Sequence, residues 1–243
     1  MFDERDVERL IDAKTRVVSL PHITPAIGFR PPVEKIGTLC RDHGILFMLD
    51  AIQSVGAVAI DVEALPVDVI ATSGHKWLCG PYGAGFMYCR SKTTRDLVPS
   101  FSAKLYTSSD SSRYDTADYD DARRWEYGSP NYSGIYGLGA ALEMINEIGI
   151  TKIEAHIGKM TSLLRESLTS YSIKIVTPAS QDISGIFSFK VNDVGAFTEK
   201  TADAGFVLSV RGGSYIRLSP HYFNDEADIE KFIDIVATFA RGN

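Results

Sequence analysis

A strand–helix–strand pattern between residues 16 and 50 constrains the fold more than any other feature of this sequence. Residues 16–20 have the pattern of an extended strand, residues 45–49 form a continuous apolar run of strand length, and residues 32–43 between them have the spacing of a helix. A run that is apolar on both faces is typical of a strand buried within a parallel sheet. Open α/β sheets bind ligands outside the carboxyl ends of their strands, and Asp50 follows the second run at that point. The pattern therefore predicts an α/β fold with Asp50 at the ligand edge.

Strands and helices continue to alternate along the rest of the chain. We expect one long helical region that breaks near Gly149, and a functional or disordered polar loop at residues 103–125. Further strands are expected at residues 67–72, 85–90, 173–176, 186–191, 206–210 and 216–218, and helices at residues 133–171, 196–204 and from 226 onward. We therefore divide the chain into a large-domain portion with a mostly parallel sheet, residues 1–135, and a small C-terminal α/β domain, residues 136–243.

Composition limits the classes of partner. The 243 residues are 44% hydrophobic, which suffices for a substantial core, and the net charge of -6 gives no electrostatic basis for binding nucleic acid or an anionic membrane. The three cysteines lack paired spacing, so we expect reduced thiols and no metal site. The N-terminus is charged and no apolar run reaches the length of a membrane helix. We expect a cytoplasmic protein without nucleic-acid or membrane partners.

Two short motifs carry the residues best suited to chemistry. The first is Asp50-Ala-Ile-Gln-Ser54, and the second is Ser73-Gly-His-Lys-Trp77, which a loop rich in glycine follows at residues 80–85. Their order and spacing closely resemble the cofactor core of the class V aminotransferase and cysteine desulfurase superfamily of fold-type I enzymes, which depend on pyridoxal 5'-phosphate (PLP). The resemblance implies the PLP-dependent transferase fold and PLP as the cofactor.

The same resemblance gives each polar residue of these motifs a role. Lys76 would hold PLP as a Schiff base, and burial would help by lowering the pKa of its amine. Asp50 would keep the pyridine nitrogen protonated, so that the ring can act as an electron sink. Gln53 would hydrogen-bond the phenolic oxygen, while Ser73 and His75 would bind the phosphate.

Two further segments are similar to the family. Ser129 stands where the family has a threonine that reaches the cofactor phosphate of the neighbouring subunit, which implies a homodimer; the alternative is a plain turn before a helix. Arg217 would bind the α-carboxylate of an amino-acid substrate through its planar guanidinium group; the alternative is an ordinary strand arginine. His22 lies in a loosely similar segment, but Pro25 occupies the place of the family's asparagine, so we carry no role over.

The resemblance implies an enzyme that acts at the α-carbon of an amino acid, by transamination, epimerisation or lyase chemistry. We rank cysteine desulfurase activity lower, because residues 210–217 contain no cysteine that could accept a persulfide. The family's N-terminal segment, which completes the phosphate site and stacks an aromatic residue on the cofactor, has no counterpart in this sequence. The alternative is therefore a truncated, split or degenerate relative that needs another chain to bind the cofactor.

Overall fold

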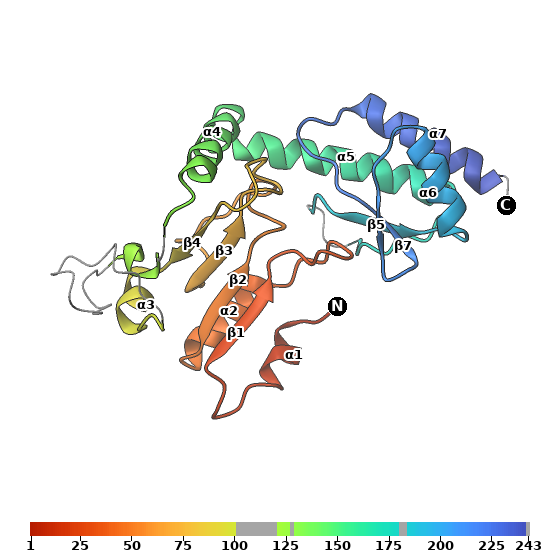
Figure 1. Cartoon of the computed structure of the whole chain (residues 1–243). Coiled ribbons are helices and arrows are strands. Elements are labelled where there is room, and N and C mark those ends of the chain that lie inside the picture. Colours follow the sequence, from red (N-terminus) through yellow and green to blue (C-terminus); the bar gives the residue numbers. More distant parts are fainter. Residues whose placement is uncertain (101–120, 127–128, 180–183, 242–243) are drawn as a thin grey trace.

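The computed structural model describes residues 1–100, 121–126, 129–179 and 184–241 (Figure 1). These described residues form two sheets, one of four strands and one of three. Most of the predicted polar loop lies outside the described residues, so its character stays a prediction. Within the described residues, no helix is both long and apolar enough to cross a membrane.

The larger sheet has the strand order β1-β2-β3-β4 and is mostly parallel. Its first three strands run parallel, and β4 pairs antiparallel at the edge. The bounds are β1 (Val17–Pro21), β2 (Leu46–Asp50), β3 (Val69–Ser73) and β4 (Gly85–Cys89). Helix α2 (Val33–Asp42) connects β1 to β2 and buries Val33, Ile36 and Cys40 at helical spacing against the sheet. The observed sheet confirms the predicted α/β class.

The smaller sheet is antiparallel, with the order β5-β7-β6. Helices pack on one of its faces, as the arrangement in Figure 1 shows. The core between them is rich in phenylalanine, including the fully buried Phe187, Phe189, Phe197 and Phe232. The bounds are β5 (Phe187–Lys190), β6 (Ser209–Arg211), β7 (Tyr215–Leu218), α6 (Val194–Asp203) and α7 (Glu226–Arg241).

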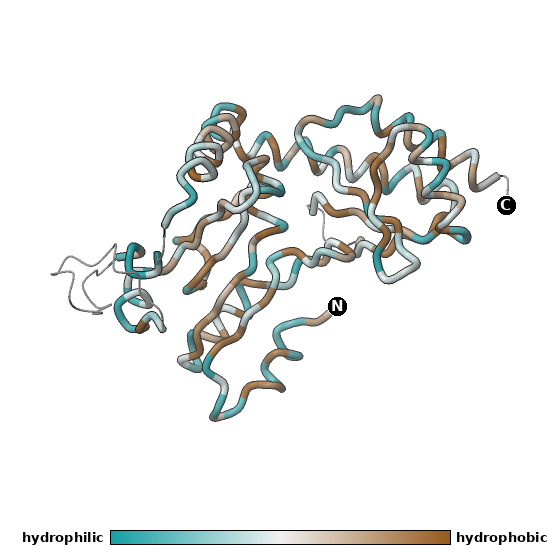
Figure 2. The backbone as a smooth tube through the Cα atoms, viewed as in Figure 1, coloured by the Kyte–Doolittle hydropathy of each residue, from teal (hydrophilic) through white to brown (hydrophobic). Residues whose placement is uncertain are grey.

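Two helices link the sheets. The predicted break near Gly149 is confirmed, because α4 (Tyr132–Ile148) ends there and α5 (Ile150–Ser170) begins directly after it, with φ of 93° at Gly149. Helix α5 contributes to the cores of both halves of the molecule. Its residue Ile153 packs with the loops of the larger sheet, whereas Leu164 packs with the small sheet. Figure 2 shows many hydrophobic residues on the strands of both sheets. The division into two domains at residue 135 stays a prediction.

The predicted strand at residues 173–176 was wrong. Ile175 forms only an isolated bridge with Phe189, because pairing with β5 is limited to a few backbone hydrogen bonds on either side of it. Three short helices were not predicted: α1 (Glu4–Glu8), α3 (Ser91–Asp96) and the 3₁₀ helix η2 (Ala122–Trp125). Such single-turn helices carry too few residues for a hydrophobic period, although Asp3 and Asp121 each provide an N-cap that could have been recognised.

Candidate functional site

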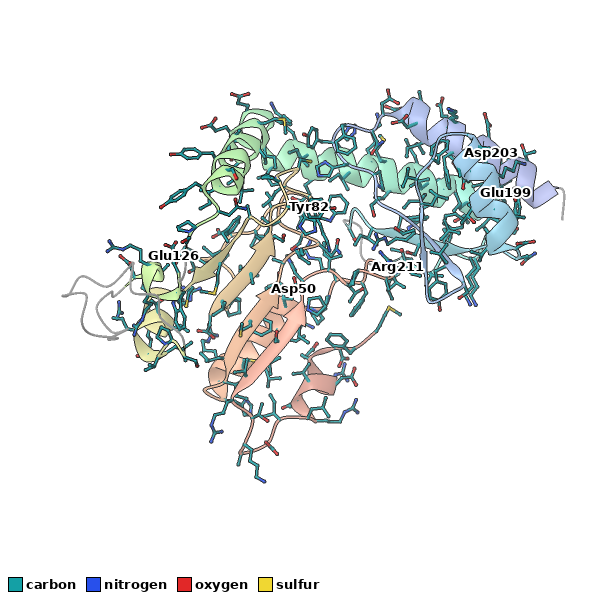
Figure 3. All side chains as sticks on the ribbon, in the orientation of Figure 1. Asp50, Tyr82, Glu126, Glu199, Asp203 and Arg211 are labelled. Carbon is teal, nitrogen blue, oxygen red and sulfur yellow. The ribbon has the colours of Figure 1, made fainter. Side chains whose placement is uncertain are left out.

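Three polar residues meet at the carboxyl edge of the larger sheet. Asp50 ends β2, Ser73 ends β3, and His22 directly follows β1. The backbone N–H of His22 donates to the Asp50 carbonyl at 2.9 Å, so the two residues are neighbours across the sheet. Figure 3 labels Asp50 at this end of β2. The parallel strands thus bring the predicted ligand edge together as expected.

Lys76 lies in the loop that connects β3 to β4. Two backbone hydrogen bonds of 2.8 Å close the loop at its base. The Gly74 N–H donates to the Ala84 carbonyl oxygen, and the Gly80 N–H donates to the Gly74 carbonyl oxygen. Trp77 is 5% exposed and anchors the loop in the core, whereas Lys76 is half-buried. A closed loop with a buried tryptophan holds the neighbouring lysine in a restricted position.

Gly56 makes the close approach of this loop possible. Its φ is 95°, and a Cβ added there would lie 2.4 Å from the Trp77 carbonyl oxygen. We expect Gly56→Ala to lower the free energy of unfolding by at least about 2 kcal/mol, since it adds both backbone strain and a collision with backbone. Gly44→Ala is the matched control, because Gly44 also has a positive φ of 65° but open space around it. Urea titrations that show equal losses for the two variants would contradict the close approach.

Ser73 and His75 are brought together at the start of the loop. The Ser73 hydroxyl lies 2.6 Å from His75 Nδ1. The His75 ring stacks on Tyr82, with centroids 4.5 Å apart and an interplanar angle of 19°. Figure 3 labels Tyr82, which is otherwise 81% exposed. Ser73 and His75, the two residues predicted to bind phosphate, are therefore in direct contact with each other. Stacking on Tyr82 restricts the orientation of the His75 ring.

Gln53 is buried, with 7% of its surface exposed. Its side-chain oxygen accepts a hydrogen bond from Trp77 Nε1 at 3.1 Å. Because the tryptophan N–H can only donate, this bond determines which end of the amide is oxygen. The amide NH₂ of Gln53 remains as a donor, which is the group that a phenolic oxygen requires.

A cavity of about 530 Å³ lies between the lysine loop and the small sheet. One part of its wall is cationic, formed by Lys76, Arg211 and Arg217. The other part is mainly apolar or aromatic. Its remaining lining residues are Pro25, Ala26, Gln53, Trp77, Ser219, His221 and Phe223. Among the described residues that line it, none has an acidic side chain, so the cavity suits an anionic small molecule.

Burial lowers the pKa of Lys76. The Asp50 carboxylate partly opposes this shift, while Arg217 and Arg211 add to it. A lower pKa increases the fraction of neutral amine near pH 7, and the neutral amine is the form that attacks an aldehyde.

The amine of Lys76 should therefore titrate below the ordinary lysine value of 10.5. Reductive methylation with ¹³C-labelled formaldehyde followed by NMR measures this directly, and Lys76→Arg assigns the signal. The Asp50→Asn variant should shift the Lys76 pKa further down, because it removes the charge that raises it. A Lys76 amine that titrates at or above 10.5 would contradict the described electrostatics.

Arg217 reaches across the molecule from β7. Its Nη1 donates to the Pro25 carbonyl at 2.9 Å, and its Nη2 donates to the Ser209 hydroxyl at 3.2 Å. Within the described part of the chain, its buried Nε has no partner. The guanidinium group is thus fixed in the cavity wall by two contacts, as a residue that orients a carboxylate needs to be.

Two histidines lie at the site although sequence reasoning gave neither of them a role. His22 is fully buried, neither ring nitrogen has a partner among the described residues, and burial lowers its pKa to about 4, with a smaller contribution from Arg30. His22 is therefore neutral at pH 7; its position directly after β1 was noticed in the sequence, but no role was assigned to it. His221 lines the cavity from a segment far along the chain.

Ser129 is not brought to this cavity. It is exposed and absent from the cavity lining, and the two residues before it lie outside the described part of the chain. Its predicted contact with the cofactor of another subunit stays a prediction.

The family model of class V aminotransferases matches residues 1–232. The chain belongs to this family. Two related proteins named probable cysteine desulfurase are each 32% identical to it: that of Methanothermobacter thermautotrophicus over 95% of this chain and 62% of its own length, and that of Streptomyces coelicolor over 87% and 49%. The chain thus spans less than two thirds of the length of these relatives.

Solved structures show the same fold. An apo structure of cysteine desulfurase from Thermococcus onnurineus NA1 matches with a TM-score of 0.88 at 26% identity, over 99% of this chain and 64% of that one. A C-DES mutant with glycine covalently linked to its PLP cofactor matches with a TM-score of 0.89 at 24% identity. The expected PLP-dependent transferase fold is therefore confirmed.

PLP is the cofactor of this class V aminotransferase family member, and the site fits it. A lysine of lowered pKa lines the cavity, close enough to Asp50 for the carboxylate to affect its charge. Ser73 and His75 offer a hydroxyl and an imidazole at one end of the same loop. Each part of PLP thus has a suitable partner: the Lys76 amine for the aldehyde, the Asp50 carboxylate for the pyridine nitrogen, and Ser73 with His75 for the phosphate.

The comparisons reverse the low rank that sequence reasoning gave to desulfurase activity. The two relatives described above are both named probable cysteine desulfurase. For ranking the desulfurases, the absence of a cysteine at residues 210–217 thus weighs less than the overall similarity of the chain to proteins of that name.

Proposed function

We propose that this chain forms the cofactor-binding and substrate-binding part of a PLP-dependent cysteine desulfurase. The observation that carries the proposal is the cavity in which Lys76 and Arg217 share one wall. An amine of lowered pKa and a fixed guanidinium group are what an α-amino acid needs for attachment and for orientation. The names of the relatives favour cysteine as the amino acid.

When bound, PLP supplies an electron sink that stabilises negative charge at the α-carbon. Lys76 would hold the cofactor and then carry the proton that leaves and returns at the α-carbon. Arg217 would pair with the substrate carboxylate and so fix the direction of the side chain. Trp77 would help to exclude water from the reacting atoms, since its ring lines the cavity and is only 5% exposed.

The sulfur acceptor that we propose is a thiol from solution. Cys79 is the cysteine nearest to Lys76 along the chain, and its N–H donates to the Lys76 carbonyl at 2.9 Å. Burial raises the pKa of Cys79, although a hydrogen bond from Tyr222 opposes this, and a protonated thiol is a poor nucleophile. In the net reaction, cysteine and an external thiol would give alanine and the persulfide of that thiol.

A lyase is the second candidate, because Cys79 is disfavoured as a thiolate acceptor, and sulfur that is not accepted by a thiol can leave as sulfide by elimination. That reaction would convert cysteine and water to pyruvate, ammonia and hydrogen sulfide. Incubation of the protein with PLP, cysteine and excess dithiothreitol separates the two candidates. We expect alanine in amounts equal to the sulfide released; pyruvate in that amount would identify the lyase, and neither product would refute both.

We also propose that the protein is a homodimer. Large apolar side chains are exposed together on α4, with Tyr132 at 64%, Ile135 at 53% and Tyr136 at 78%. Apolar groups of this kind are typical of a surface that another chain covers. Ser129 lies three residues before the start of α4 and would reach the cofactor phosphate of the partner. Light scattering that finds only monomers at micromolar concentration would contradict this arrangement.

A further inference from the structure

His221 lies where the substrate-binding strand meets the lysine loop. Its side chain is 5% exposed and lines the same cavity as Lys76 and Arg217. Its Nε2 lies 2.9 Å from the carbonyl oxygen of Trp77, the residue next to Lys76. The Tyr222 backbone N–H donates to its Nδ1 at 2.7 Å.

These two contacts determine the protonation state of His221. A carbonyl oxygen can only accept, so Nε2 must carry a hydrogen, and Nδ1 must be bare because it accepts from Tyr222. Burial lowers the pKa of His221 and so favours the neutral ring, although the contact with the Trp77 carbonyl opposes this shift. Cys79 Sγ lies 4.0 Å from Nε2, but the hydrogen on Nε2 already points to Trp77, so His221 is not a base for this thiol.

The ring and the backbone of His221 are both fixed. The ring stacks on both Trp77 and Phe223, with centroids 5.1 Å away in each case and interplanar angles of 25° and 2°. The backbone N–H donates to Asn224 Oδ1 at 3.0 Å. His221 is therefore a rigid connection from the segment after β7, which carries Arg217, to the loop that carries Lys76.

We infer that His221 is a positioning residue, which holds the Trp77 carbonyl and thereby keeps Lys76 in its partly buried place beside Arg217. The inference deepens the proposed function and rests on it for the role of Lys76 in catalysis. The restriction of the Lys76 amine is a property of this chain even without cofactor, and this allows an independent test.

The test compares three forms of the protein without PLP. His221→Phe keeps a ring that can stack on Trp77 and removes both ring hydrogen bonds, whereas the amide of His221→Gln can still donate to the Trp77 carbonyl. The readout is the titration of Lys76 after ¹³C methylation. We expect an upward shift of the Lys76 pKa in His221→Phe, because the loop loosens and the amine gains water, and a titration close to wild type in His221→Gln.

A Lys76 titration that is unchanged in His221→Phe, or equally shifted in both variants, would overturn the inference. A second measurement needs no variant: ¹⁵N spectra of the imidazole at pH 7 should show neutral His221 with its hydrogen on Nε2, and a charged ring or a hydrogen on Nδ1 would also overturn the inference.

A third measurement uses the cofactor. When PLP is added, His221→Phe should attach it at least about tenfold more slowly than His221→Gln. A wild-type protein that attaches no PLP refutes the proposed function, while the titration and the ¹⁵N spectra still decide the role of His221.

Discussion

Lys76→Ala should abolish the borohydride-reducible attachment of PLP and lower turnover of cysteine by about 10³-fold or more. Alanine has neither the amine that forms the linkage nor a group that can return a proton to the α-carbon, and proton transfer by a positioned side chain alone contributes about 10²–10⁴-fold. The visible absorption of the protein with PLP measures attachment, and the release of sulfide and alanine measures turnover.

Lys152→Ala is the matched control for this variant, because Lys152 is an exposed lysine on α5 and does not line the cavity. It should attach PLP and turn over cysteine as the wild-type protein does. If Lys76→Ala keeps the absorption band and its reduction by borohydride while Lys152→Ala loses them, the assignment of the cofactor lysine is wrong.

Asp50→Asn should lower turnover by about 10²-fold or more while leaving attachment of PLP possible. Asparagine keeps the shape of the side chain and can still accept the hydrogen bond that Asp50 Oδ1 receives from the Ile52 N–H at 3.0 Å. It cannot keep a proton on the pyridine nitrogen by charge, so the cofactor would lose most of its power to stabilise negative charge. Single-turnover kinetics with cysteine separate this effect from slower binding of the substrate.

The control is Asp203→Asn, which removes an equal charge from the exposed end of α6, far from Asp50 in Figure 3. This variant should retain wild-type turnover. Equal losses in the two variants would show that net charge, and not the carboxylate at the sheet edge, controls the rate.

The parallel strands and their carboxyl edge could be predicted from sequence because the pattern is local. The apolar run before Asp50 and the spacing to Ser73 are sufficient to place both at one edge, since parallel strands end together. The same reasoning extends to Lys76 and His75, which follow Ser73 within three residues. Their roles in cofactor binding remain proposals, and Lys76→Ala tests that of Lys76.

Contacts between distant segments could not be predicted in this way. Arg217 and Pro25 are 192 residues apart, and His221 and Trp77 are 144 residues apart. No periodicity along one segment reports such a contact, because it depends on how the small sheet packs on the lysine loop. Pro25 stood out only as a departure from the family pattern, whereas in the structure its backbone carbonyl anchors the guanidinium group of Arg217.

The reaction was harder to predict than the cofactor. The cofactor leaves a compact pattern of residues around Lys76, whereas the choice between transamination and carbon–sulfur cleavage depends on a few atoms of the cavity wall. Reliance on one missing cysteine ranked the desulfurases too low, although the thiol of the lysine loop, Cys79, is itself disfavoured as a nucleophile: its side chain is exposed, but partial desolvation raises its pKa. Product analysis with an external thiol addresses this directly.

The most direct test of the central claim is to map the site of attachment. Protein incubated with PLP is reduced with borohydride, digested with protease, and analysed by mass spectrometry. We predict a single phosphopyridoxyl group on Lys76, with no adduct in the Lys76→Ala variant. An adduct on another lysine, or protein that remains unmodified at saturating PLP, would contradict the claim that this chain holds its cofactor through Lys76.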